Sequence, residues 1–328
     1  MAYSVGGLIQ AADFNGFANS GANNVNQVWS TGTGDLGWGQ SALSTVSAGA
    51  TVTATNWAGL VNTLSSMGAH TGTSITSRAA PVAGNLIQVL SNVQTDINNI
   101  KTNRGNAVAS GSINNSFSGT VSKTTTTGTG NNAWIIGWGH TITWPSAAQA
   151  RYFWNAGGLI RIDMSKTSTG LDSDPDWNSF VSSIGTLYIS GRVNGASQSI
   201  AGTTYTGFTR IGGSGTPSTL ATTTGWYNLT SSPDLLFKIY NSASPYTDDS
   251  IGLVAYNPDA TTTILASSWS AVARTGAGQN TQISGGTATT SPFTSFGTAP
   301  TVLVRLIPPS TTYLTNSWGT PTINSGVS

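Results

Sequence analysis

The chain has 328 residues, of which 38% are hydrophobic and 7% are charged, and its formal net charge is +1. The hydrophobic fraction excludes a globally disordered chain, and the length predicts about two domains. The small net charge excludes a surface field that would attract nucleic acid or an anionic membrane. The acidic residues are all Asp. Because Glu normally coats exposed helix faces, we expect a mainly β fold with a minority of helix.

Helical periodicity is confined to residues 1–104, which we predict to form a small α-helical module for attachment and oligomerisation. A helix over residues 11–29 would carry Gly21 and four apolar side chains on one face, namely Phe14, Phe17, Val25 and Val28. A second helix is expected after Thr53, a good N-cap residue. Its apolar side would hold Trp57, Leu60, Val61 and Leu64.

A third helix, expected over residues 84–103 and ending at Gly105, suggests how copies of the chain associate. Its apolar residues alternate at spacings of four and three, namely Leu86, Leu90, Val93, Ile97 and Ile100. Such a heptad seam is typical of helices that pack on copies of themselves, and mixed Ile and Leu favour three strands. We therefore predict a homotrimer with this seam as its interface. The alternative is the apolar stripe of an ordinary core helix.

Residues 105–132 are rich in Gly, Ser and Thr, a composition typical of a linker or of extended strands that need partners. Beyond them the hydrophobic period changes to two. This predicts a β-sandwich-like domain over residues 133–310 and an extended C-terminal tail over residues 311–328. The expected strands include 159–164, 186–193, 235–240, 252–256 and 301–307. One helix over residues 147–155, capped by Ser146, should interrupt them.

Several strings in the chain resemble tail-fibre-like virion proteins of tailed bacteriophages, those of cyanophages and their T4-like relatives. In the first half they are LIQAADFN at residues 8–15, GTGDLGWGQ at 32–40 and VTATNW at 52–57. In the second half they are ARYFWNAGGLIRI at 150–162 and DWN at 176–178. The segment around Asp172 is longer and more acidic than the usual pattern. The resemblance implies a virion location more than any activity.

Some of the tryptophans could form a glycan-binding face, because flat exposed indoles stack on sugar rings. The candidates cluster around the bend at 137–139 or lie in later strands, namely Trp134, Trp138, Trp144, Trp226 and Trp269. Aromatic residues also dominate cores and subunit contacts. Core packing or subunit contact is therefore the competing interpretation.

The acidic residues do not form a recognisable metal or catalytic motif. Asp172, Asp174 and Asp176 alternate in a way that Ca²⁺ loops use. The EF-hand pattern fails because Trp177 replaces its Gly and the chain has no Glu. We expect a solvated acidic loop and no metal. Glycoside hydrolysis needs two carboxylates that flank the scissile bond, and no such pair stands out. We therefore expect no enzyme activity and no cofactor.

The glycine-rich string at residues 32–37 matches Gly-x-Gly-x-x-Gly, the pattern of dinucleotide-binding loops. Those loops follow a strand and open a helix, whose N-terminus meets the pyrophosphate. Here a predicted helix precedes the string and no helical pattern follows it. We therefore predict a tight glycine turn. His70 and His140, the two histidines, are expected to be packed or surface residues.

Taken together, these patterns predict a structural protein of a phage virion, a tail fibre or tail-associated component that acts by homo-oligomeric assembly. Its partners would be copies of itself, other virion proteins and a host surface glycan. The alternatives are a capsid decoration protein and a receptor- or glycan-binding module. The amino terminus lacks a secretory pattern, and no stretch of eighteen apolar residues predicts membrane insertion. We expect assembly in the host cytoplasm and release by lysis.

Overall fold

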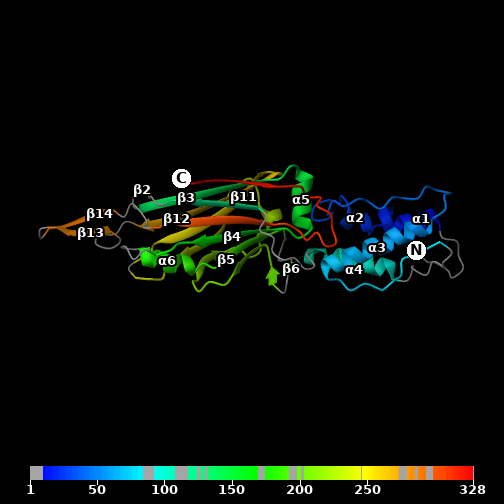
Figure 1. The fold of residues 1–328 in the computed structure, drawn as a ribbon, viewed down its shortest axis with the longest axis horizontal. Helices are drawn as coiled ribbons and strands as arrows, with labels where there is room; N and C mark the ends of the chain where they lie inside the picture. The colour runs from blue at the N-terminus through cyan, green and yellow to red at the C-terminus, as the bar shows by residue number, and fades with distance from the viewer. Residues whose placement is uncertain are drawn as a thin grey trace.

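The computed structural model describes residues 10–83, 92–107, 117–123, 127–129, 132–168, 174–191, 198–200, 203–244, 246–272, 279–284, 287–292 and 298–327. The molecule is elongated (Figure 1). Helices occupy one end, two β-sheets form the middle, and a hairpin of two strands lies at the other end. The predicted fold class, mainly β with a small helical N-terminal part and a β-sandwich-like body, is confirmed.

The helical end contains α1 (Ala11–Asn15), the π-helical turn η1 (Gly16–Ser20), α2 (Val25–Trp29), α3 (Ala54–Thr71), α4 (Val93–Asn103) and the 3-10 turn η2 (Arg104–Asn106). The single helix expected over residues 11–29 is wrong, because the chain is extended at Gly21 (φ −72°, ψ 157°). A Cβ atom there would lie 2.3 Å from the carbonyl oxygen of Gly16. Gly21 therefore ends the helix, since other residues would clash with the preceding turn.

The expected helix after Thr53 is confirmed as α3. The Thr53 hydroxyl accepts a hydrogen bond from the backbone N–H of Asn56, and the Asn56 side chain accepts one from the N–H of Thr53. This capping box satisfies donors at the helix start that would otherwise lack partners. The apolar side of α3 is buried as expected, including Trp57 and Leu60. The expected helix capped by Ser146 is α5 (Ala147–Asn155).

The body consists of two antiparallel sheets. The five-stranded sheet has the order β1 (Phe117–Ser122), β15 (Thr301–Ile307), β4 (Leu159–Ser165), β5 (Thr186–Ser190), β8 (Phe208–Ile211). The seven-stranded sheet has the order β16 (Thr322–Val327), β3 (Asn132–Thr143), β12 (Thr262–Val272), β11 (Ser250–Asp259), β10 (Asp234–Tyr240), β9 (Pro217–Leu220), with β2 (Thr127–Thr129) also beside β3.

Two hairpins and two short helical elements complete the body. The hairpins are β6 (Gln198–Ile200) with β7 (Thr203–Tyr205) and β13 (Gln279–Ser284) with β14 (Thr287–Pro292), and the helical elements are α6 (Asp174–Ser182) and the 3-10 turn η3 (Trp226–Asn228). The β13–β14 hairpin projects beyond the sheets, away from the helical end (Figure 1).

Strands also occupy the two segments whose composition is least informative. Within residues 105–132, β1 pairs with β15 and β2 pairs with β3, so extended strands with partners are present where a linker was the other interpretation. Near the end of the chain, β16 pairs with β3 from Thr322 to Val327. The extended C-terminal segment therefore includes a sheet strand.

One hydrophobic core runs from the helical end into the sandwich. It joins Phe14 and Trp57 near the start of the chain to Trp154 on α5 and Trp269 on β12. The ring of Trp38 lies 5.0 Å from the ring of His70 on α3, which links the loop after α2 to the helices. Because the core is continuous, the helical end and the sandwich cannot separate without exposing apolar surface to water.

Candidate functional site

The seam residues of α4 lie inside the chain's own core. Val93, Ile97 and Ile100 are 1%, 2% and 0% exposed. The predicted oligomer interface is therefore wrong for these three residues, because α3 of the same chain and its neighbours already cover them. Leu86 and Leu90 lie outside the described residues. The heptad spacing is in this case the apolar stripe of a core helix.

The tryptophans proposed for glycan contact are also buried. Trp138, Trp144, Trp226 and Trp269 are at most 7% exposed, so their proposed role as a glycan-stacking face is wrong. Alternation along β3 turns Trp138 inward, where its ring lies 4.8 Å from that of Trp269. Trp269 in turn stacks on Trp177 at 5.9 Å and 6°. The side chain of Trp134 lies outside the described residues.

Asp174 and Asp176 lie in a helix, so the expected acidic loop is wrong at these positions. Helix α6 begins at Asp174, and Asp176 accepts a hydrogen bond of 2.6 Å from the Nδ2 atom of Asn241. Pro175 suits a first helical turn, and Trp177, Phe180 and Val181 have helical spacing, so the sequence contained the missed signal. Asp172 lies outside the described residues. Among the described residues, no three His or Asp side chains form a group that could hold a metal ion.

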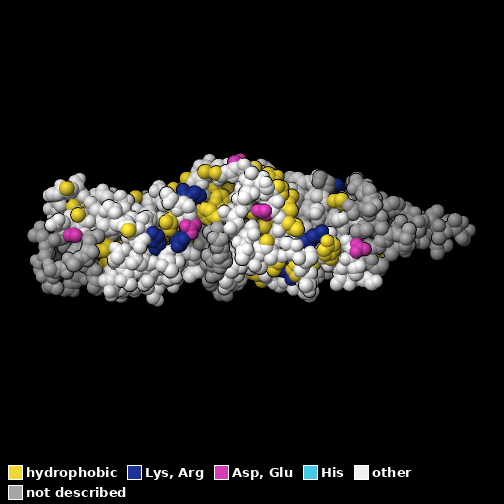
Figure 2. Space-filling view, turned by 180° about the vertical axis from the view of Figure 1, so that it is seen from behind, with side chains coloured by type: hydrophobic (Ala, Val, Ile, Leu, Met, Phe, Trp, Pro, Cys, Tyr) yellow, Lys and Arg dark blue, Asp and Glu magenta, His cyan; other side chains and the backbone are white. Residues whose placement is uncertain are grey.

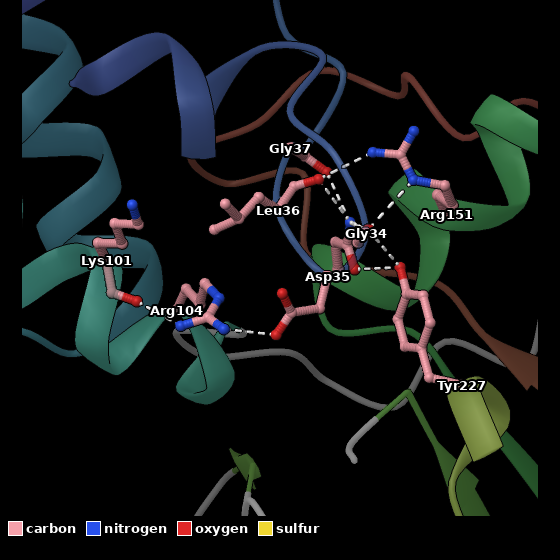
Figure 3. A network of polar contacts seen from close by, with 9 residues as sticks. Gly34, Asp35, Leu36, Gly37, Lys101, Arg104, Arg151 and Tyr227 are labelled. Carbon is pink, nitrogen blue, oxygen red and sulfur yellow. Dashed lines mark hydrogen bonds and ion pairs between the residues drawn. The ribbon is translucent and has the colours of Figure 1, made fainter. Parts of the chain in front are cut away.

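The glycine-rich string at residues 32–37 forms the turn that was predicted, and that turn binds the sandwich. Gly32, Gly34 and Gly37 all have positive φ angles, which glycine adopts without strain. This conformation points several backbone carbonyl oxygens toward α5 (Figure 3). The Nη2 atom of Arg151 donates to the carbonyls of Thr31, Gly32 and Leu36 at 3.0–3.1 Å.

Asn155 and Tyr227 complete this junction from the sandwich side. The Nδ2 atom of Asn155 donates to the carbonyls of Leu36 and Gly37 at 2.9 and 3.1 Å. The Tyr227 hydroxyl lies 2.7 Å from the Oδ1 atom of Asn155, to which it donates. On the helical side, Asp35 forms an ion pair with Arg104, and Arg104 also donates to the carbonyl of Lys101 (Figure 3). The turn is therefore held by charged and polar side chains from both the helical end and the sandwich.

Both histidines are buried, so of the two expected roles, packed or surface, they have the packed one. Each has a perturbed pKa. Burial lowers the pKa of His70 to about 4, against the backbone hydrogen bond to Ala156, which raises it. Burial also lowers the pKa of His140 to about 4, with an opposing contribution from a backbone hydrogen bond to Val302. Each ring has one buried nitrogen without a partner in the structure. Both imidazoles are therefore neutral at pH 7.

A charged cluster lies on the five-stranded sheet. The carboxylate of Asp163 accepts hydrogen bonds from Arg161 on the same strand, from Arg305 on β15 at 2.6 Å and from the hydroxyl of Thr186 on β5 at 3.1 Å. Arg305 and Arg161 are direct cross-strand neighbours. Like charges in that position repel, so the carboxylate between them stabilises the pairing of β4 with β15. The cluster joins three strands of the sheet.

A groove crosses the outer face of the seven-stranded sheet. Its volume is about 620 Å³. The row along its floor is Gly137, Ser268, Gly252 and Lys238, which the strand register places side by side on β3, β12, β11 and β10. One row flanks it on each side: Ile135, Ser270, Ser250 and Tyr240 on one, and Gly139, Ala266, Val254 and Leu235 on the other. The large side chains of these rows stand at their ends or near Lys238. No pattern in the sequence predicted this groove.

Comparison of the chain with protein-family models, with curated proteins and with solved structures finds no match. Within the described residues, no helix combines the length and the hydrophobicity that crossing a bilayer would require.

Proposed function

We propose that this chain is a structural protein of a tailed-phage virion, a tail-fibre or other tail-associated component that assembles as a homo-oligomer. The observation that carries this proposal is the continuous core of an elongated molecule, which joins the helical end to the sandwich. Because bending between the helical end and the sandwich would expose this core to water, such a body suits a projecting part of a particle. The resemblance of its sequence strings to tail-fibre-like proteins supports the same role.

The edge formed by β8 and β9 is the surface that best fits assembly with a second copy. These strands end the two sheets on one side of the sandwich and are joined by residues 212–216. Ile211 and Leu220 on them are 36% and 37% exposed. Figure 2 shows hydrophobic side chains gathered near the middle of one side of the molecule, with a few charged side chains around them. Exposed apolar side chains on open strand edges favour association.

The mass of the purified chain in solution tests this assembly. We expect light scattering coupled to size-exclusion chromatography to give a multiple of the 33.6 kDa chain mass. Changing Ile211 and Leu220 together to Asp should reduce the mass to that of one chain. Val82, 65% exposed at the helical end, provides the control Val82→Asp, which should keep the oligomer. A monomeric wild-type chain would contradict homo-oligomeric assembly.

Immunogold labelling of purified particles tests the location. We expect antibodies against the chain to label the tail or its fibres. Label on capsids that lack tails would instead favour a decoration protein, and absence of label from intact particles would overturn the virion role. These results do not depend on which surface joins the copies.

A further inference from the structure

The groove on the seven-stranded sheet has the dimensions of a site for one extended polymer chain. Alternate residues of a strand are spaced about 7 Å apart, so a single row of small side chains leaves a slot one row wide. Gly137, Ser268 and Gly252 form that row. Val254 and Leu235 stand on one side, and Ile135 stands on the other. The volume of about 620 Å³ lies in the range of ligand-binding pockets.

Two glycines of the groove are not required by the fold. Neither Gly139 nor Gly252 has a positive φ angle. A Cβ atom would meet nothing within 4 Å at Gly139, and at Gly252 its nearest neighbour would be the Ser268 Oγ atom at 3.6 Å. Glycine inside a strand weakens it, and its presence often marks a close approach by a ligand or another backbone. The open space here lies over the groove.

The polar groups of the groove indicate the chemistry of its occupant. In the described part of the chain, the hydroxyls of Ser250, Ser268 and Ser270 have no hydrogen-bond partner. Lys238 is the only charged residue among those that line the groove. Its ammonium lies 4.8 Å from the centre of the Tyr240 ring, and no described carboxylate forms an ion pair with it. The groove thus offers hydroxyls, apolar walls and one cation that lacks a counter-ion.

We propose that this groove binds an acidic polysaccharide chain. The apolar C–H faces of its sugar rings would pack against Val254 and Leu235, and its hydroxyls would exchange hydrogen bonds with the three serines. A carboxylate on the chain would pair with Lys238, which supplies the charge complementarity at the end of the groove. This inference stands apart from the proposed role in a virion, because binding to the groove does not require assembly at β8 and β9.

Calorimetric titration of the full chain tests the proposal. The ligands are alginate oligosaccharides and, in parallel, neutral dextran oligosaccharides. We expect alginate to bind and dextran to bind at least about tenfold more weakly, since only alginate carries the carboxylate. The variant Lys238→Gln should lose about tenfold in alginate affinity and leave dextran binding unchanged. Equal binding of both polymers, with no effect of Lys238→Gln, would overturn the assignment of an acidic ligand.

Filling the slot tests its location. The variant Gly252→Val, in the floor row, should abolish binding while the thermal unfolding midpoint stays the same or rises, because valine favours strands. Gly326 provides the matched control. It pairs with Gly139 on β16, does not line the groove, and has open space at its Cβ position. Gly326→Val should keep full affinity. Retained binding in the filled variant would overturn the site. The site would also be overturned if the wild type bound no saccharide and the filled variant changed from an oligomer to a monomer, because the groove would then join copies of the chain.

Discussion

The Nε2 atom of His70 lies 3.0 Å from the carbonyl oxygen of Ala156, directly beyond the end of α5. This contact joins the longest helix of the helical end to the sandwich. Its acceptor is a carbonyl oxygen, so Nε2 carries the proton in the neutral ring. A second proton would have to sit on Nδ1, which is buried without a partner in the structure. Charging His70 would therefore place a positive charge in a buried site, and this burial outweighs the hydrogen bond to Ala156, which by itself favours the charged ring.

Acid should destabilise the protein between pH 6.5 and pH 4. The pKa values of His70 and His140 are about 4 in the folded chain, whereas an unfolded histidine has its ordinary value of 6.5. In this window the unfolded state binds more protons, so stability falls as the pH falls and is fully retained only above about 6.5. Each histidine should contribute a loss of roughly 3 kcal/mol. Urea unfolding at pH 7 and pH 4 measures the total.

The variant His140→Gln isolates one contribution, because its amide can still hydrogen-bond and does not titrate. We expect the loss of stability between pH 7 and pH 4 to be about half that of the wild type. An unchanged loss would show that carboxylates, and not this histidine, cause the acid sensitivity.

The polar junction should behave as one unit. Asn155→Ala should reduce the free energy of unfolding by about 2 kcal/mol, because the carbonyl of Gly37 loses the side chain that donates to it, whereas that of Leu36 keeps Arg151. Tyr227→Phe should cost about 1 kcal/mol. Because the hydroxyl of Tyr227 donates to Asn155, the double variant should lose less than the sum of the two. Tyr313→Phe, at a residue that is 39% exposed, is the control. Additive losses would show that the two side chains act independently.

The buried ion pair at the helical end should be more sensitive to the loss of one partner than of both. Arg78 and Asp96 are 7% and 4% exposed, with 2.6 Å between Nη1 and Oδ2. Asp96→Asn leaves a buried guanidinium without its counter-charge and should cost about 3 kcal/mol. The double variant Arg78→Met with Asp96→Leu should lose less stability than Asp96→Asn alone, because it leaves no unpaired charge. Asp248→Asn, at an exposed aspartate, should change the unfolding midpoint little. A double variant less stable than Asp96→Asn would contradict this account.

Two glycines with similar backbone angles allow strain to be separated from steric clash. Gly39 and Gly49 have φ angles of +71° and +79°. A Cβ atom at Gly39 would lie 2.3 Å from the ring of Tyr152, whereas at Gly49 it would meet nothing within 4 Å. Alanine at position 49 should cost about 1 kcal/mol for the left-handed conformation alone. Alanine at position 39 should reduce the free energy of unfolding at least twice as much. Thermal unfolding of the two variants measures the difference. Equal losses would show that Tyr152 moves aside without cost.

Local patterns in the sequence predicted the elements whose signals are local. The cap at Thr53 and the apolar spacing that follows it specify α3, and Ser146 does the same for α5, because capping involves residues only three positions apart. Alternation of apolar residues located the strand at residues 301–307 for the same reason. By contrast, β1 has weak apolar alternation, and its partner β15 lies far along the chain. Composition therefore did not distinguish a linker from a strand within residues 105–132.

The candidate sites could not be located from spacing alone. A heptad seam and a core stripe share the same spacing, so only the position of α3 shows that Val93 and Ile97 face inward. Alternation shows that Trp138 faces one side of β3, but it does not say which side a second sheet covers. The groove depends on the register of four strands, which places Gly137 beside Ser268 and Gly252 beside Lys238. No short stretch of sequence contains that arrangement.

The pairing of β16 with β3 has a consequence for how the protein is made. β3 is synthesised early, but one of its neighbours is complete only at Val327. β1 likewise waits for β15 before Phe117 can pair with Leu306. Contacts between residues so distant in sequence slow folding, because a long loop must close before they form. The sandwich should therefore close only after residues 322–327 have been synthesised, and until then its strand edges would need protection from other nascent chains.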